Sequence, residues 1–418
     1  MLQKVGHELE ANTLDEYWQG ALNDALLAVF DYGDGTGVLP DYIRSQNWGH
    51  AVQIVDILIK AGAYINAHSG DPIQRTALHY ALDEQEPPLE LIAFLIDQGA
   101  DVNFRDSCGR SAFFELLEHP KATKELVKMF TDAGAVVGPP DARGQNPLHC
   151  VRISSIASWL IASGADISAV DDEGETPLHK ASSKHNLELV SLYLDEGTPI
   201  DRRNNLRWTP FMQSPSASIS KALLDHGADI HAATDQGITA IHQAAKACNQ
   251  ELILLLLANG ANVHARTVRE EPTCDFDIGT IIVEGNTPLH LAVASAHGAL
   301  NGQTLEVVTA LLDHGADIEA KEGTGKTPLL LAISTKFYNR WSWTSNEKAV
   351  NCLLERGANP HAVDDSAKNA FQLADDKHYK FSETGQFERK PPQFSHEHNM
   401  GGGRGRVRGA YGRGGFHS

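Results

Sequence analysis

The stretch Gly174-Glu175-Thr176-Pro177-Leu178-His179-Lys180-Ala181 decides the fold of this chain, because a close copy returns at residues 285–292 as Gly-Asn-Thr-Pro-Leu-His-Leu-Ala. A Gly, most often followed by Ala, precedes each such segment, and the separation is 12 residues in seven of nine cases. Recurrence at a fixed spacing predicts a repeat architecture instead of a single compact globule. The nine segments begin at Thr76, Ser111, Asn146, Thr176, Thr209, Thr239, Thr287, Thr327 and Asn369.

The length of the repeat identifies the family that the chain resembles. Two of the segments are followed by the next Gly after 21 residues, and 21 plus 12 gives a period of 33 residues. This is the period of ankyrin repeats, whose signature is also Thr-Pro-Leu-His. The chain therefore resembles the ankyrin-repeat family over about residues 42–377. The resemblance implies an all-α solenoid of stacked helix-turn-helix units, with β-hairpin loops between units.

The residues of the motif have clear structural roles. Pro at the first helical position (Pro177, Pro288, Pro328) lacks only an N–H that the helix does not use, and the preceding Thr can cap the helix. In the family, the motif histidine hydrogen-bonds around the start of the first helix and towards the neighbouring unit. Phe114, Met212 and Leu330 replace it in three units, where we expect weaker polar coupling. The repeat-motif residues are Thr76, His79, His149, Thr176, Pro177, His179, Thr239, His242, Thr287, Pro288, His290, Thr327 and Pro328.

We expect three regions along the chain. Residues 1–41 form an N-terminal helical cap, because apolar residues recur at helical spacing over residues 8–31. Residues 42–377 form the solenoid, and Asn369 to Lys377 begins like a repeat without its second helix, so it caps the C-terminal end. Residues 378–418 form a disordered tail, since the Gly- and Arg-rich stretch 400–418 has too little apolar content to fold alone.

Several units depart from the regular length. The repeats at Asn146 and Thr209 are three residues short, which predicts the loss of about one helical turn and a local bend in the stack. An acidic insertion occupies about residues 269–284, within a hairpin. The next two units carry seven and nine extra residues between their helices.

Composition excludes several classes of function. The formal net charge of -19, with +3 on residues 381–418, argues against nucleic-acid binding by the body of the chain. The longest clean apolar run, Leu252 to Ala258, is far shorter than a membrane span of about 20 residues. Residues 1–13 lack the apolar stretch of a secretory signal. The five cysteines form neither a Cys-x-x-Cys pair nor a disulfide pattern. We therefore expect a protein inside the cell, cytoplasmic or nuclear, with no membrane partner.

The candidate nucleotide, metal and catalytic motifs in the sequence are incomplete or are explained by the repeat. Gly323-Thr324-Gly325-Lys326-Thr327 resembles the end of a phosphate-binding loop, but Ala320 stands where that pattern requires Gly, and the segment lies in hairpin register. His396 and His398 could supply only two metal ligands. No activated nucleophile or catalytic carboxylate pair is present. We predict no enzymatic activity, cofactor, metal or small-molecule substrate.

The leading hypothesis is a scaffold or adaptor that binds other proteins, with basic segments matching an acidic repeat surface. Aromatic residues are enriched in binding hot spots, so the expected contacts are Phe337, Tyr338, Trp341 and Trp343, together with Asp275 and Asp277 of the acidic insertion. The alternative is an RNA-associated adaptor. Its tail is similar to the RGG-type tails of RNA-associated proteins, and its RNA contacts would be Arg404, Arg406, Arg408 and Arg413.

Overall fold

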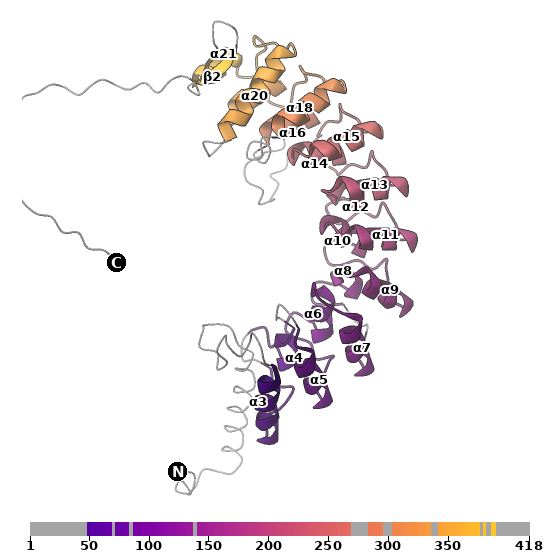
Figure 1. The fold of residues 1–418 in the computed structure, drawn as a ribbon. Helices are drawn as coiled ribbons and strands as arrows, with labels where there is room; N and C mark the ends of the chain where they lie inside the picture. The colour runs from indigo at the N-terminus through magenta and orange to yellow at the C-terminus, as the bar shows by residue number, and fades with distance from the viewer. Residues whose placement is uncertain are drawn as a thin grey trace, which may run out of the picture.

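Pairs of short helices stack side by side into a curved array (Figure 1). The structure is a computed structural model that describes residues 48–68, 72–82, 87–136, 140–268, 283–295, 303–335, 342–376, 379–381 and 386–389. The predicted all-α ankyrin solenoid is confirmed. The N-terminal cap expected at residues 1–41 lies outside the described residues. None of the helices within the described part is long and apolar enough to cross a membrane.

Most repeats contribute a first helix, which begins at the motif segment, and a second helix, which is followed by the Gly of that repeat. Among the described residues, α3 stands without a first helix before it and α21 without a second helix after it. The first helices are α4 (Ala77–Tyr80), α6 (Ala112–Glu118), α8 (Pro147–Cys150), α10 (Pro177–Ser183), α12 (Pro210–Gln213), α14 (Ala240–Lys246), α16 (Pro288–Ala294), α19 (Pro328–Ser334) and α21 (Ala370–Asp376). The second helices are α3 (Trp48–Lys60), α5 (Leu89–Asp97), α7 (Lys124–Asp132), α9 (Ser154–Ala162), α11 (Leu187–Asp195), α13 (Ala217–Asp225), α15 (Gln250–Ala258), α18 (Thr304–Asp313) and α20 (Ser342–Glu355).

The repeat at Thr176 shows why these segments fold as they do. Thr176 has extended backbone and its hydroxyl accepts from the backbone N–H of His179, while Pro177 takes the first helical position. At the other end, Gly197 follows α11 with a φ of 77°, a conformation that favours glycine. Leu178 and Val190 are fully buried between units, and they belong to one core that runs through the whole stack. Each such side chain contributes roughly 1.5–3 kcal/mol of hydrophobic stabilisation.

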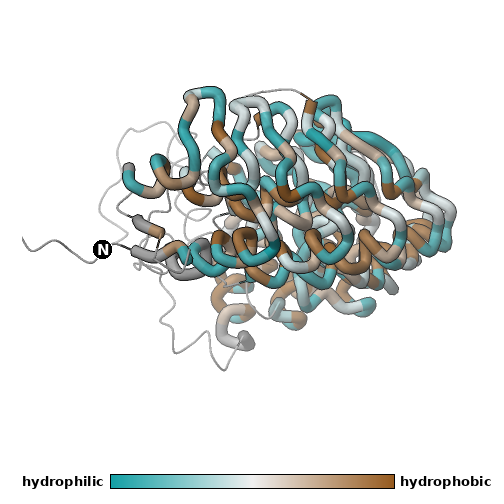
Figure 2. The backbone as a smooth tube through the Cα atoms, turned by 90° about the horizontal axis from the view of Figure 1, so that it is seen from above, coloured by the Kyte–Doolittle hydropathy of each residue, from teal (hydrophilic) through white to brown (hydrophobic). Residues whose placement is uncertain are grey.

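Hairpin fingers join the repeats, and Figure 2 shows that their turns are mostly hydrophilic while the helices carry the hydrophobic residues. Consecutive fingers are connected at their tips, where a backbone N–H donates to a carbonyl of the preceding finger at 2.6–3.1 Å. The same backbone hydrogen bond recurs from finger to finger across the stack. Written from the N–H donor to the carbonyl acceptor, these bonds join Ser107 to Ile73, Ala142 to Cys108, Asp172 to Arg143, Asn205 to Glu173, Val268 to Gln236, Gly323 to Glu284 and Asp365 to Thr324.

The irregular repeat lengths shorten the first helices as predicted, while the local bend of the stack stays a prediction. Helices α8 and α12 have four residues each, whereas α10 and α14 have seven, so the short repeats lack one turn of the first helix. The extra residues of the last large repeats fall between α16 and α18 and between α19 and α20. Those loops, including residues 296–302 and 336–341, lie outside the described residues.

The C-terminal end of the stack differs from the expectation that a disordered tail begins at residue 378. Strands β1 (Tyr379–Phe381) and β2 (Phe387–Arg389) pair antiparallel beyond α21. The ring of Phe381 packs against that of Phe371 of α21, with the centroids 4.5 Å apart and the planes tilted by 48°. The backbone of Phe387 exchanges two hydrogen bonds with the side amide of Asn351. Within the described residues no second helix follows α21, and this hairpin packs against α21 in its place. The described C-terminal end of the stack therefore includes this hairpin, whose second strand ends at Arg389.

Candidate partner-binding surface

The five motif histidines connect successive repeats through both ring nitrogens. In the repeat at Thr176, the Thr176 backbone N–H donates to Nδ1 of His179 at 3.1 Å, and Nε2 lies 3.2 Å from the Trp208 carbonyl oxygen in the next repeat. A carbonyl oxygen can only accept, so Nε2 carries the proton and Nδ1 is the acceptor. The same arrangement joins His79 to Arg110, His149 to Glu175, His242 to Asn286 and His290 to Lys326.

These histidines are neutral structural residues. Burial lowers the pKa of His242 and His290 to about 4, and it also lowers the pKa of His149 and His179. A charged imidazolium would have two donors and would lose the hydrogen bond that Nδ1 accepts. In three of the four units without the histidine, Phe114, Met212 and Leu330 are buried at the motif position. In the fourth, the side-chain oxygen of Gln372 accepts from the backbone N–H of Asn369. The motif thus holds the repeats in register and leaves their outer surfaces available.

The most acidic described surface lies on the finger formed by residues 164–176, which we call the acidic finger. It carries five carboxylates and no basic residue. Asp171 is a turn former, since its Oδ1 accepts from the backbone N–H groups of Glu173 and Glu175. The Nζ atom of Lys180 lies 2.6 Å from Glu175, 3.0 Å from Asp171 and 3.3 Å from Glu173. This ammonium group occupies the place that a metal ion would take among the three carboxylates.

The carboxylates of the acidic finger differ in how closely they pair with Lys180 and in how exposed they are. Although burial opposes it, hydrogen bonding to Glu175 and Asp171 raises the pKa of Lys180, and the same contacts lower the pKa of both carboxyls. Glu175 also accepts from Asn204 and Gln213. Asp172 is exposed and makes no ion pair with a described residue, and the Glu173 side chain is 75% exposed. Asp172 and Glu173 therefore present the charge that a partner can reach.

A hollow of about 520 Å³, which we call the acidic hollow, separates this finger from the next. Asp172 and Glu173 form one wall, and the half-buried Trp208 and the exposed Leu206 belong to the opposite finger. Leu206 is 69% exposed, the largest exposure among the large hydrophobic residues described. Carboxylates on one side and apolar surface on the other are suited to a side chain with a long aliphatic stem and a positive end.

The opposite finger, residues 197–209, is basic. It carries Arg202, Arg203 and Arg207 against the single carboxylate of Asp201. Arg207 has a φ of 64° at the turn position that is glycine in most fingers, and its guanidinium lies 3.7 Å from Asp235 of the following finger. We refer to residues 197–209 as the basic finger. The hairpin surface is thus not uniformly acidic, because charges of opposite sign are segregated on neighbouring fingers.

Of the partner- and RNA-binding residues expected from the sequence, only Trp343 lies in the part of the chain that the structure describes. Phe337, Tyr338, Trp341, Asp275 and Asp277 lie outside the described residues, and so do Arg404, Arg406, Arg408 and Arg413. Trp343 belongs to the first turn of α20. In the phosphate-loop-like segment, the backbone N–H groups of Thr324 and Lys326 donate to the Glu322 carboxylate. That carboxylate occupies the donors a phosphate would need, which agrees with a hairpin turn.

Sequence reasoning missed the acidic hollow, although one signal was present. The run Asp201-Arg202-Arg203-Asn204-Asn205-Leu206-Arg207-Trp208 replaces the usual small turn residues with arginines, Leu and Trp. A hairpin turn has no structural need for an exposed Leu or for an Arg at positive φ. What the sequence could not reveal is that Asp172 lies across from this run, because the two are brought together only by stacking.

Stacked helix pairs, hairpin fingers and the bridging histidines together define an ankyrin-repeat protein. Family models confirm this class: ankyrin repeats in three copies match residues 116–204, 151–234, 183–267, 213–321 and 272–364, and a single ankyrin repeat matches residues 74–107. The matches cover more than half of the chain, which therefore belongs to the ankyrin-repeat family. This family is in general a non-enzymatic interaction module.

The chain is similar to parts of several curated proteins. The chain is 30% identical to the mouse B-cell lymphoma 3 protein homolog over 223 residues, which is 51% of this chain and 44% of that protein. It is 25% identical to the chicken nuclear factor NF-kappa-B p105 subunit over 296 residues, 67% of this chain and 27% of that protein. It is 30% identical to the variola virus ankyrin repeat protein OPG189 over 154 residues, 35% and 27% respectively. The match spans less than half the length of each relative.

Proposed function

We propose that this chain is a protein-binding adaptor whose acidic hollow receives a basic residue of an extended partner segment. The observation that carries the proposal is the pairing of two reachable carboxylates, on Asp172 and Glu173, with the exposed Leu206 across the same hollow. Lys180 makes its two shortest ion pairs with the buried Asp171 and Glu175, so the exposed carboxylates of Asp172 and Glu173 are the ones that a partner in the hollow can reach.

The chemistry of the hollow favours Lys or Arg with an apolar neighbour. The aliphatic stem of such a side chain can lie against Trp208, where a cation near the ring gains about 0.5–1 kcal/mol at an exposed site. Leu206 offers contact area to an adjacent apolar residue of the partner. The basic finger next to the hollow repels a partner that is basic along its whole length, so the preferred segment has one or two basic residues beside apolar ones.

A random peptide library panned against the purified chain tests this proposal. We expect the enriched peptides to combine Lys or Arg with Leu, Ile or an aromatic residue. The double variant Asp172→Asn with Glu173→Gln should weaken the best peptide about tenfold, and Leu206→Ser should weaken it by a few-fold. Glu196→Gln, an exposed carboxylate at the end of α11, is the matched control and should leave binding unchanged. Equal binding by the double variant and the control contradicts the proposal.

The enlarged repeats between about Ala261 and Glu355 form a second proposed contact region for protein partners. Phe337, Tyr338, Trp341 and Trp343 supply the aromatic residues that dominate hot spots, and Asp275 with Asp277 extends the acidic character. Deletion of residues 269–284, or the change of Trp341 and Trp343 to Ala, should weaken partner capture while the circular dichroism spectrum stays helical. Unchanged capture by both variants would remove this region from the proposal.

An RNA-associated role is the second candidate, and the Arg- and Gly-rich composition of residues 400–418 favours it. Arg404, Arg406, Arg408 and Arg413 each stand next to a Gly, and Tyr411 and Phe416 can stack on bases. Four arginines neutralise few phosphates, so the affinity should be weak and should fall steeply with salt. Ultraviolet crosslinking of the full chain and of a chain ending at residue 399 separates the two candidates, because only a tail-dependent signal supports RNA contact.

A further inference from the structure

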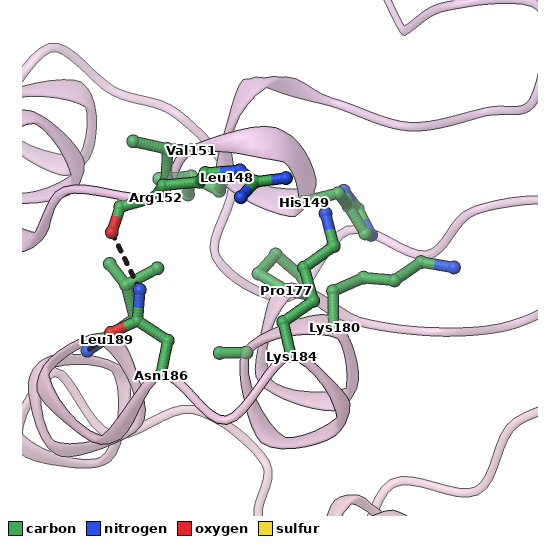
Figure 3. A pocket seen from close by; sticks show the side chains of 10 residues that line it. Leu148, His149, Val151, Arg152, Pro177, Lys180, Lys184, Asn186 and Leu189 are labelled. Carbon is green, nitrogen blue, oxygen red and sulfur yellow. Dashed lines mark hydrogen bonds between the residues drawn. The ribbon is translucent and has the colours of Figure 1, made fainter. Parts of the chain in front are cut away.

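A second cavity lies on the other side of Lys180 and has the opposite charge (Figure 3). It exists because α8 ends at Cys150 after four residues, whereas α10 continues to Ser183. No α8 residue therefore covers the last turn of α10, and a cavity of about 260 Å³ remains between the two repeats. We call it the cationic pocket.

Most polar groups that line the cationic pocket are already bonded within the protein. Asn186 donates through Nδ2 to the Arg152 carbonyl at 2.7 Å and accepts from the backbone N–H of Leu189 (Figure 3). Both ring nitrogens of His149 are used in the bridge between repeats. Lys180 is held by the three carboxylates of the acidic finger. None of these groups can bind a ligand without losing an existing partner.

Arg152 and Lys184 are the exceptions. Figure 3 shows the two side chains reaching over the cavity from different elements, Arg152 after α8 and Lys184 at the end of α10. The Arg152 guanidinium forms no ion pair with a described residue. The Lys184 side chain is 41% exposed, and its Nζ atom lies 3.6 Å from Glu118. Both cations act on Glu118: burial opposes the shift, but Arg110, Lys184 and Arg152 together hold the pKa of this carboxyl below its ordinary value.

The local charge is positive although the chain carries a formal charge of -19. Arg110 is bonded to Glu118 at 2.6 Å, so one carboxylate faces three cations and about two positive charges remain uncompensated. Cations held near each other repel, and an anion placed between them relieves that repulsion. The floor of the pocket is apolar, with Leu148, Val151 and Pro177.

We infer that the cationic pocket binds a glutamate side chain of a protein partner, with the carboxylate between Arg152 and Lys184 and the methylene groups on the apolar floor. The volume of 260 Å³ is below the roughly 300–1,000 Å³ of small-molecule sites, so it suits one side chain and not a nucleotide. This inference does not depend on the acidic hollow, because different residues and the opposite charge carry it.

Labelled peptides provide the test. The probe is a fluorescein-labelled 12-residue peptide with four glutamates among Gly, Ser and Leu, and its partner probe has glutamine at the four positions. In fluorescence anisotropy the full chain should bind the glutamate peptide at least about tenfold more tightly than the glutamine peptide. The variants Arg152→Gln and Lys184→Gln should each remove most of that difference. Lys221→Gln, an exposed lysine on α13, is the matched control and should retain it.

A second measurement keeps the inference testable if a variant folds poorly. In the wild-type chain, the glutamate peptide should protect Lys184 from acetylation by acetic anhydride, read by mass spectrometry, and should leave Lys221 reactive. Equal binding of the two peptides, or full reactivity of Lys184 at saturating glutamate peptide, would overturn the inference. Failure of the basic peptides at the acidic hollow has no bearing on this outcome, because the probes and variants differ.

Discussion

The backbone N–H of Asp235 does not donate to the carbonyl oxygen of Leu206, although the equivalent pair is hydrogen-bonded at the other described junctions between consecutive fingers. The same junction lacks the histidine bridge, because Met212 occupies the motif position in the repeat at Thr209. Where Phe114 and Leu330 replace the histidine, the fingertip bond is still present. Among the described junctions, only the one between the repeats that begin at Thr209 and Thr239 lacks both the fingertip bond and the histidine bridge. Its remaining polar contacts include the Asp229 N–H on Asp201 and the Asn249 side amide on the Pro215 carbonyl.

This junction should be the first place where the solenoid opens. Each absent hydrogen bond removes about 0.5–1.5 kcal/mol of coupling, and repeat stability depends on nearest-neighbour interfaces. Native-state hydrogen exchange should show faster exchange of the amides of α12 and α13 than of α10 and α11. Equal protection of the two helix pairs would contradict this expectation.

Met212→His should strengthen the junction. Thr209 already has the extended backbone of a cap residue, so the new imidazole can accept from its N–H and donate to the Ile238 carbonyl. We expect about 1 kcal/mol of added stability in urea unfolding followed by circular dichroism. The reverse change, His179→Met, is the control and should lower stability by a similar amount or more. A Met212→His variant less stable than the wild type would show that the pocket cannot take the ring.

Stability should fall as the pH drops from about 6.5 towards 4. Burial places the folded-state pKa of His242 and His290 at about 4, below the unfolded value near 6.5, so the unfolded chain binds protons first in this window. The stabilising contribution is present above pH 6.5 and is lost as the pH falls through the folded pKa, and the complete loss is about 3 kcal/mol per histidine.

Urea unfolding at pH 7, 6 and 5 measures this slope. The double variant His242→Gln with His290→Gln should be less stable at pH 7 and should show a shallower pH dependence. Carboxyls with lowered pKa, such as Asp171 and Glu175, lose their contribution only at lower pH, so they do not account for the slope between pH 5 and 6.5. A wild-type slope no steeper than that of the double variant would refute the assignment.

Gly174→Ala should destabilise the contact between the acidic and basic fingers. A Cβ atom on Gly174 would lie 2.9 Å from the Asn205 backbone nitrogen and 2.6 Å from its Oδ1 atom, and the φ of 73° is itself unfavourable for alanine. Gly164→Ala has a similarly positive φ of 91° with open space around the Cβ, so it isolates the conformational cost of roughly 1–2 kcal/mol. Gly174→Ala should exceed that cost in thermal unfolding, and equal losses would argue against a steric role for Asn205.

Lys180→Met should cost about 3 kcal/mol, because it leaves the carboxylates of Asp171 and Glu175 close together and without their cation. Lys221→Met removes an exposed pair with Asp225 and should cost less than about 1 kcal/mol. Urea unfolding at pH 7 compares the two. Similar small losses in both variants would show that Lys180 is dispensable to the acidic finger.

Much of the fold could be predicted from the sequence because the determinants are local and repeated. Thr176 and Pro177 start a helix, Gly197 ends one, and their spacing sets the period. The three residues missing before Gly164 correctly predicted that α8 is one turn short. The β1–β2 hairpin was not predictable in the same way, because its strands are only three residues long. Contacts with Asn351 of α20 and Phe371 of α21 stabilise it, and these depend on the tertiary structure.

The sequence by itself determined that this chain is an ankyrin solenoid, which helices are shortened, and where the histidine bridges are absent, because each of these depends on residues within one repeat. Only the tertiary structure decided the candidate sites. Asp172 faces Leu206, and Arg152 and Lys184 share one cavity, because stacking places residues about 33 positions apart next to each other. The sign of the charge that a partner meets depends on which carboxylates Lys180 already neutralises, and only the three-dimensional arrangement specifies this.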